Sequence, residues 1–169
     1  MDFAELSQIL FDGLCPRLTE HSGAALMAAE RCRLDDWLAV EAFGVLVQAG
    51  LKPDVEKEKM DVACGPWGLL VRTLVTNIPC DQAQNKNRPI KKSIEGTVKE
   101  IWKLTTPGQT AFKHRAMLLA AYPTTHDNER WQSLHLRQIA GELTRLEHRP
   151  FQFWGDIPGV LYLGLCTEE

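Results

Sequence analysis

The chain lacks any apolar run that approaches the roughly 18 residues needed to cross a bilayer. Residues 1–5 also lack the basic start and small-residue cleavage site of a secretory signal. From these two absences we expect a cytoplasmic protein with no membrane partner.

Cysteine and histidine are too few and too scattered to form a recognisable cassette. The number of cysteines is odd, no pair has the CxxC spacing, and no histidines have the HxxxH spacing. These patterns favour reduced, packing thiols and argue against a disulfide framework or a zinc site. The residues concerned are Cys15, Cys32, Cys64, Cys80 and Cys166, with His21, His114, His126, His135 and His148.

The composition is that of an ordinary globular domain. The 169 residues are 44% hydrophobic and 24% charged, without repeats or low-complexity tracts. Such values exclude a disordered tail, a fibre and a coiled-coil rod, and the length suits one domain. We therefore expect a single domain over 1–169.

Hydrophobic periodicity predicts helices and strands in mixed order. The expected helices are a first one closed by Pro16, a partly helical stretch over 18–32, one over 35–49 capped by Asp35 and Asp36, one begun by Ser93, and one over 129–147. The expected strands are 52–59, 60–64, 68–78, 114–122 and 160–166. This order predicts an α/β fold with a mixed central sheet flanked by helices. Composition places strand 68–78 inside the sheet and the charged strand 52–59 near an edge.

Charge is unevenly distributed along the chain. Residues 82–115 hold 8 basic and 2 acidic side chains, whereas residues 1–81 hold 7 and 13. Lys86, Arg88, Lys91 and Lys92 lie in this basic segment, before or at the start of a predicted helix. Basic residues at a helix N-terminus suit phosphate groups, so DNA or RNA could bind through 86–103. The alternative is an ordinary solvated loop and helix face.

Two acidic residues stand in unusual surroundings. Glu41 is the sole charged residue in the otherwise apolar segment 37–51, which predicts a helix buried nearly all round. Asp61 lies within a short predicted strand, where an acid is unfavourable unless it points into a cleft. A buried carboxylate needs a partner, which is either a single core ion pair or part of a site.

The expected elements include, in order, a helix carrying Glu41, a meander whose second strand carries Asp61, a third strand, a crossover helix and a fourth strand. In this order they resemble the PD-(D/E)XK, or restriction-endonuclease-like, nuclease superfamily. The resemblance covers about residues 35–122 as a nuclease-like core, leaving 1–34 as a helical extension and 123–169 as a C-terminal helix and strand. It implies that Glu41 and Asp61 would hold a divalent cation, usually Mg²⁺, and that the third strand would bring Glu-x-Lys.

The third strand departs from the family pattern. In the sequence LLVRTLV, Arg72 stands where the family has Glu, and Leu74 where it has Lys. The literal string PDVEKEK at 53–59 is no substitute, because its letters share one segment whereas the family divides them between successive strands. We predict instead that Arg72 pairs with Glu41, Asp61 or both, replacing a metal with a fixed cation. Arg72 pointing to solvent is the alternative.

Three functional hypotheses follow from these residues. The first is a catalytically impaired nuclease-like protein that needs no cofactor and binds nucleic acid or a protein partner. The second is an active Mg²⁺-dependent nuclease using Glu41 and Asp61, with Glu56 or Glu58 as a further ligand and Lys99 as a relocated catalytic lysine. The third is a small interaction or immunity-type module that uses Phe151, Phe153 and Trp154, although core packing is the expected role of these aromatic residues.

Overall fold

Six strands form one mixed sheet in the order β1-β2-β3-β4-β6-β5 in the computed structural model of the chain, which describes residues 1–85, 89–106, 108 and 110–168. The helical elements are α1 (Phe3–Glu20), α2 (Ser22–Ala29), α3 (Asp35–Gln48), α4 (Lys91–Thr105), α5 (Glu129–Trp131), the π-helical segment η1 (Gln132–Leu136) and α6 (Arg137–Ala140). The strands are β1 (Pro53–Lys57), β2 (Met60–Cys64), β3 (Trp67–Val75), β4 (His114–Tyr122), β5 (Arg145–Phe153) and β6 (Ile157–Glu168).

The sheet combines a meander, a crossover and a hairpin. Strands β1, β2 and β3 are successively antiparallel, and α4 carries the chain to β4, which pairs parallel with β3. Strand β6 is antiparallel to β4, and β5 completes the far edge. The predicted mixed α/β class, the interior position of β3 and the edge position of β1 are confirmed.

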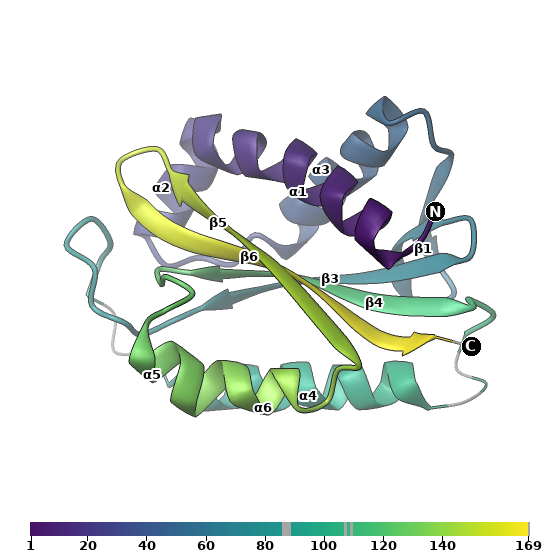
Figure 1. Cartoon of the computed structure of the whole chain (residues 1–169). Helices are drawn as coiled ribbons and strands as arrows, with labels where there is room; N and C mark the ends of the chain where they lie inside the picture. The colour runs from purple at the N-terminus through teal and green to yellow at the C-terminus, as the bar shows by residue number, and fades with distance from the viewer. Residues whose placement is uncertain (86–88, 107, 109, 169) are drawn as a thin grey trace.

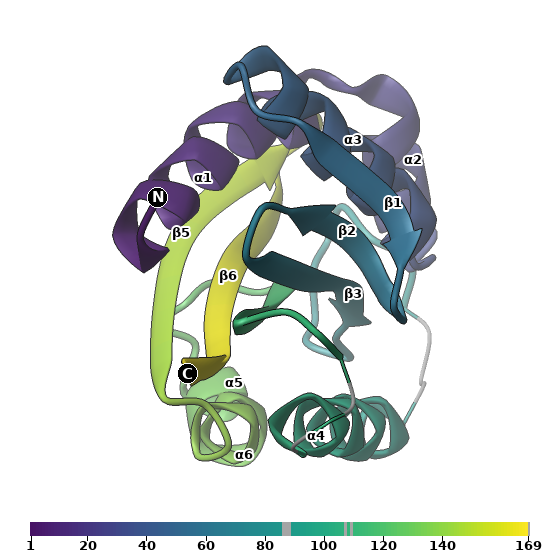
Figure 2. The same ribbon diagram turned by 90° about the vertical axis from the view of Figure 1, so that its right-hand side faces the viewer.

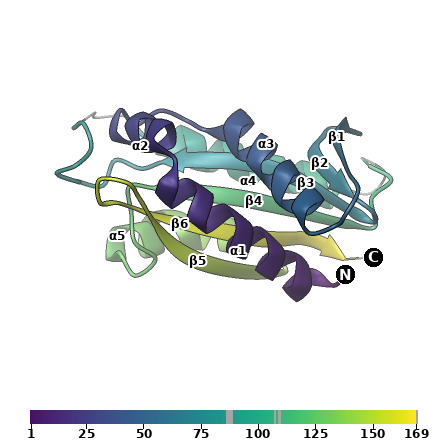
Figure 3. The same cartoon turned by 90° about the horizontal axis from the view of Figure 1, so that it is seen from above.

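Helices cover both faces of the sheet (Figure 1). Helices α1, α2 and α3 lie on one face, and α4, α5 and α6 lie on the other, as the end-on view in Figure 2 shows. Seen from above, α1 and α3 lie over the sheet, oblique to its strands (Figure 3). Each face therefore has its own hydrophobic core, and a side chain on a central strand contacts one helical layer or the other.

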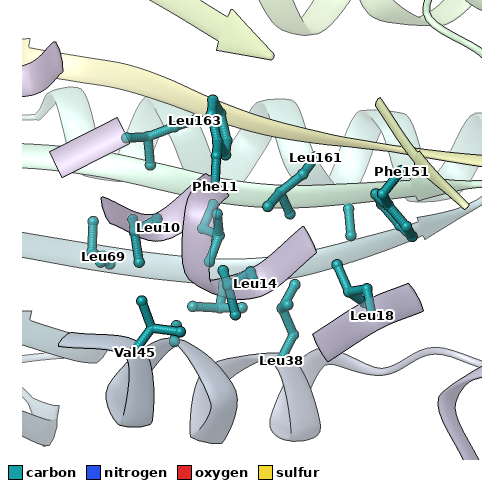
Figure 4. Close-up of a cluster of buried hydrophobic side chains, with 14 of the residues drawn as sticks. Leu10, Phe11, Leu14, Leu18, Leu38, Val45, Leu69, Phe151, Leu161 and Leu163 are labelled. Carbon is teal, nitrogen blue, oxygen red and sulfur yellow. The ribbon is translucent and has the colours of Figure 1, made fainter. Parts of the chain in front are cut away.

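Leucine dominates the larger core, which lies between α1, α3 and the sheet. Figure 4 shows the apolar face of α1 meeting α3 and the inner strands through residues that include Leu10, Leu14, Leu38, Leu69 and Leu163. All five of these leucine side chains are fully buried. The second cluster joins α4, η1 and α6 to the opposite face of the sheet.

The N-terminal helix does not end at Pro16 as predicted. Asp2 and Glu5 form a capping box at its start, and α1 continues through Pro16 to Glu20. Packing of the apolar face of α1 against α3 and β5 supports the last turn despite the missing proline N–H. The following stretch is helical in α2, in line with the partly helical prediction.

Helix α3 is less buried than its sequence suggests. Val40 is 67% exposed and Val47 is 48% exposed, so one apolar face of α3 meets solvent. Asp35 is also not the predicted cap, because Leu34 precedes the helix and makes no side-chain cap. Asp35 instead accepts hydrogen bonds from the N–H and hydroxyl of Thr73, at 2.7 and 2.5 Å, which ties α3 to β3.

The C-terminal region contains a strand that the sequence pattern did not predict. The helix expected over 129–147 ends at Ala140, and β5 begins at Arg145. Phe151 and Phe153 are buried in β5, as core packing required, whereas Trp154 is 69% exposed.

Within the described ranges no helix is both long and apolar enough to cross a membrane.

Candidate functional site

Strand β3 presents alternate side chains to the two helical layers. Val71 belongs to the core beneath α1 and α3, whereas Leu70 and Leu74 belong to the core beneath α4. Arg72 lies between Leu70 and Leu74 and faces the same side as they do. The period of two therefore directs its guanidinium toward α4.

The Arg72 guanidinium lies between two carboxylates. Its Nε donates to Oε2 of Glu100 at 2.9 Å and its Nη2 donates to Oε1 of the same residue at 3.1 Å. Its Nη1 donates to Oδ2 of Asp61 at 2.8 Å. The predicted contact between Arg72 and Asp61 is thus confirmed, and Glu100 on α4 supplies a second anion.

These three side chains are partly screened from solvent. The side chains of Arg72, Asp61 and Glu100 are 21%, 34% and 31% exposed. Burial alone would lower the pKa of Arg72, but the hydrogen bonds and negative charges of Glu100 and Asp61 raise it above its ordinary value. Arg72 is therefore a permanent cation at this position.

The acid in β2 has a structural reason. Regular pairing between β2 and β3 reaches Val62 opposite Leu69. Just beyond it, Oδ2 of Asp61 accepts a hydrogen bond from the backbone N–H of Val71 at 2.6 Å. A carboxylate thus satisfies both a β3 amide and the adjacent guanidinium, which fixes the position of Asp61.

Glu41 does not join this cluster: of the two acids predicted as partners of Arg72, Asp61 contacts it and Glu41 does not, so Glu41 and Asp61 do not form the shared site that the resemblance implied. Its carboxylate pairs with Nη1 of Arg17 on α1, and Nη2 of Arg17 also donates to Gln48 at 2.7 Å. Helices α1 and α3 lie across the sheet from α4, so β2 and β3 separate Glu41 from Arg72. The partner of Glu41 comes from another helix, 24 residues earlier in the chain.

Lys99 also lies outside the cluster. It is exposed and lines a groove with Trp102 and Gln138, facing α6. The following residue, Glu100, is the one that faces β3, so α4 brings a carboxylate to Arg72 where a relocated lysine was expected. Trp102 on the same side of α4 is 51% exposed, and its indole N–H donates to Glu142 at 2.6 Å.

Two pockets flank the Arg72–Glu100 pair, and both residues line each of them. The larger has a volume of about 460 Å³ and is lined by Lys59, Met60, Leu70, Arg72, Glu100, Lys103, Leu104 and Thr110. The smaller has a volume of about 230 Å³ and is lined by Arg33, Arg72, Thr73, Leu74, Lys92, Ser93, Gly96, Thr97 and Glu100. The ion pair is therefore the partition between two openings on one face of the molecule.

The predicted basic segment is partly described. Lys86 and Arg88 lie outside the described residues. Lys91 and Lys92 are exposed in the first turn of α4, with Lys91 3.8 Å from Glu95. Helix α4 begins at Lys91 after Ile90, so Ser93 lies inside the helix and is not the predicted cap.

The other acidic candidates do not complete a metal site. Glu58 accepts a hydrogen bond from the N–H of Ala111 at 2.6 Å, and the side chain of Glu56 is outside the described part of the chain. Asp61 and Glu100 are both bound by Arg72. No group of three or more His, Cys, Asp or Glu side chains suited to a metal ion occurs among the residues that the structure describes.

Glu100 is the site residue that sequence reasoning missed. It follows Thr97 by three positions and precedes Leu104 by four, and both of those residues are buried against the sheet. This spacing puts Glu100 on the flank of the buried face of α4, within reach of a central strand. An acid on that flank, opposite an arginine in an apolar strand, was the available signal.

Comparison with known proteins adds no relative to these findings. No family model, curated protein or solved structure matches this chain.

Proposed function

We propose that this chain is a nucleic-acid-binding protein with a restriction-endonuclease-like core and without metal-dependent nuclease activity. The observation that supports the proposal is the placement of Arg72, whose guanidinium holds both Asp61 and Glu100. Of the two acids that the resemblance assigned to a divalent cation, Asp61 is bound by Arg72 and Glu41 is bound by Arg17 on the other face of the sheet.

A guanidinium at this point replaces one property of a metal ion and not another. It supplies positive charge and a bidentate donor pair, both of which suit carboxylate or phosphate oxygens. It does not bind and activate a water molecule, which is how metal-dependent nucleases generate their nucleophile. Because Arg72 is already bound by Asp61 and Glu100, it argues against hydrolysis at this point, and the charge for binding must come from the surrounding residues.

The surroundings of the ion pair carry further positive charge. Arg33 and Lys92 line the smaller pocket, and Lys59 and Lys103 line the larger one. All four side chains are exposed, and Lys91 extends the basic surface along the first turn of α4. Phosphate groups spaced along one strand of DNA or RNA suit such a distribution.

Binding is tested by fluorescence anisotropy with labelled single-stranded and duplex oligonucleotides at two salt concentrations. We expect binding that weakens steeply with salt. The double variant Lys91→Ala with Lys92→Ala should weaken binding about tenfold. It should also reduce, by about two, the slope of the logarithm of the binding constant against the logarithm of the salt concentration. The matched control is Arg130→Ala with Arg137→Ala, which removes two exposed positive charges from α5 and α6.

Equal loss in the two double variants would indicate non-specific attraction and contradict this placement of the nucleic acid. Absence of binding at low salt by the folded protein would overturn nucleic-acid binding and favour a protein partner, for which Trp154 is an exposed anchor. Cleavage of either oligonucleotide on addition of Mg²⁺ or Mn²⁺ would overturn the non-catalytic assignment.

A further inference from the structure

The larger pocket beside Arg72 has an apolar floor. Met60 from β2, Leu70 from β3 and Leu104 from α4 line it, and these residues are 1%, 6% and 5% exposed. Its volume of about 460 Å³ lies within the range of small-molecule sites. A flat apolar group of ring size could therefore be covered on one side by these three side chains.

The rim of the same pocket is polar and positively charged. Lys59 and Lys103 are exposed there, and neither has an ion pair within the described ranges. Oγ1 of Thr110 is buried and has no hydrogen-bond partner among the described residues. The pocket thus combines two exposed ammonium groups, and a hydroxyl without a partner in the described part of the chain, with its apolar floor.

The wall that carries Lys59 is held in place by a contact between distant segments. Glu58 and Lys59 form the turn between β1 and β2, both with positive φ, of 50° and 68°. The carboxylate of Glu58 accepts the N–H of Ala111 at 2.6 Å. This hydrogen bond joins the turn to the segment beside Thr110, so two sides of the pocket are fixed before any ligand enters.

We propose that this pocket binds one nucleotide unit of a nucleic acid, with the base on the apolar floor and the phosphate at Lys59 and Lys103. The proposal rests on the proposed function and assigns a nucleotide site to it. A bare phosphate would leave the apolar floor uncovered, and an uncharged hydrophobe would leave both ammonium groups without a partner.

Glu100 gives the pocket a preference among bases. Each of its carboxylate oxygens accepts one hydrogen bond from Arg72 and retains capacity to accept another. A base with an exocyclic amino group can donate to that oxygen, whereas a carbonyl in the same place would face a carboxylate. Cytosine is therefore preferred to uracil, from which it differs at that position by an amino group.

The test uses the full chain and 5′-CMP, with 5′-UMP, cytidine and inorganic phosphate as comparison ligands. Binding is followed through the NMR signals of the methyl groups of Met60, Leu70 and Leu104 and by calorimetry. We expect 5′-CMP to shift these methyl signals and to bind about fivefold more tightly than 5′-UMP. Cytidine and phosphate alone should bind about tenfold more weakly, because each occupies half of the site.

Two variants on exposed lysines locate the phosphate. Lys59→Ala with Lys103→Ala should weaken 5′-CMP binding about tenfold, since both ammonium groups are removed. Lys99→Ala is the matched control, because Lys99 lies one turn before Lys103 on α4 but lines a different groove. It should leave the affinity within about twofold of the unaltered protein.

The outcomes separate this inference from the proposed function. Oligonucleotide binding that leaves the methyl signals of Met60, Leu70 and Leu104 unmoved overturns the nucleotide pocket while nucleic-acid binding stands. Binding of 5′-CMP without any oligonucleotide binding keeps the pocket and overturns the proposed function. Phosphate that binds as tightly as 5′-CMP, or equal losses in the Lys99 and Lys59/Lys103 variants, also overturns the pocket.

Discussion

At the scale of single residues, the need to neutralise partly buried charge decides which side chains meet. Glu41 is neutralised by Arg17 on one face of the sheet, and Arg72 is neutralised by Asp61 and Glu100 on the other. Both partnerships join residues from different elements. A charge that looks isolated in its own helix or strand therefore indicates a partner elsewhere in the fold.

Replacing Arg72 by alanine should destabilise the protein by about 1–3 kcal/mol, because Asp61 and Glu100 would lose their shared cation. The effect stays below that of a fully buried pair, since both carboxylates are about one-third exposed. Arg72→Lys should recover part of the loss, as it keeps the charge but loses the bidentate contact. Urea denaturation followed by circular dichroism measures the difference.

The control for that substitution is Lys91→Ala, which breaks the exposed contact between Lys91 and Glu95. It should change the free energy of unfolding by no more than about 0.5 kcal/mol. An Arg72→Ala variant as stable as this control would show that the cluster adds nothing to the fold.

At the scale of elements, β5 forms because the adjacent strand β6 needs a hydrogen-bonding partner along its second edge. Strand β6 is buried over most of its length and pairs with β4 on one side, so its other edge needs a second partner. Strand β5 supplies the hydrogen bonds of that edge, and α1 packs against it. The helix expected up to residue 147 therefore ends at Ala140, and the residues from Arg145 onward pair with β6.

Gly159 lets the aromatic ring of Phe151 lie directly on β6. A methyl group at Gly159 would approach the ring atoms to between 2.3 and 2.8 Å. Gly159→Ala should therefore destabilise the protein by about 1–3 kcal/mol through overpacking. Thermal unfolding should show a lower midpoint for this variant.

The control is Gly96→Ala within α4, for which we expect a change in stability of the opposite sign. An added methyl group there meets nothing within 4 Å. It should stabilise the protein by about 0.5–1 kcal/mol, since alanine favours helix over glycine. A Gly159→Ala variant that gained stability as well would contradict the close packing of Phe151 on this strand.

At the scale of the whole molecule, the two helical layers make the centre of the sheet the most protected part. Strands β3, β4 and β6 have strand neighbours on both sides and helices over both faces, whereas β1 and β5 lie at the edges (Figures 1 and 2). Site residues attached to β3 are therefore held by the most stable part of the fold.

Amide hydrogen exchange should reproduce this order. The amides of β4 should exchange slowest, with protection that approaches the global free energy of unfolding, and those of β1 and β5 should exchange fastest among the strands. Mass spectrometry of peptides or NMR measures the rates. Exchange from β4 as rapid as that from β1 would contradict the central position of β4.

The sequence alone determined the features that depend on local pattern. Alternating charge placed 52–59 at an edge, continuous apolar residues placed 68–78 inside, and the order of elements predicted a mixed sheet with helices on both faces. Period-two alternation also put Arg72 on the same strand face as Leu70 and Leu74, and its contact with Asp61 followed from the adjacent strand.

Tertiary structure alone decided the partners that come from distant elements. Glu41 met Arg17 and Arg72 met Glu100 because the chain crosses from one face of the sheet to the other between α3 and α4. Strand β5 and the continuation of α1 beyond Pro16 likewise depend on packing that local propensity does not encode. Pairing across a sheet and burial between layers contribute several kcal/mol, more than the preferences of a single helical turn, and so they override the local pattern at these points.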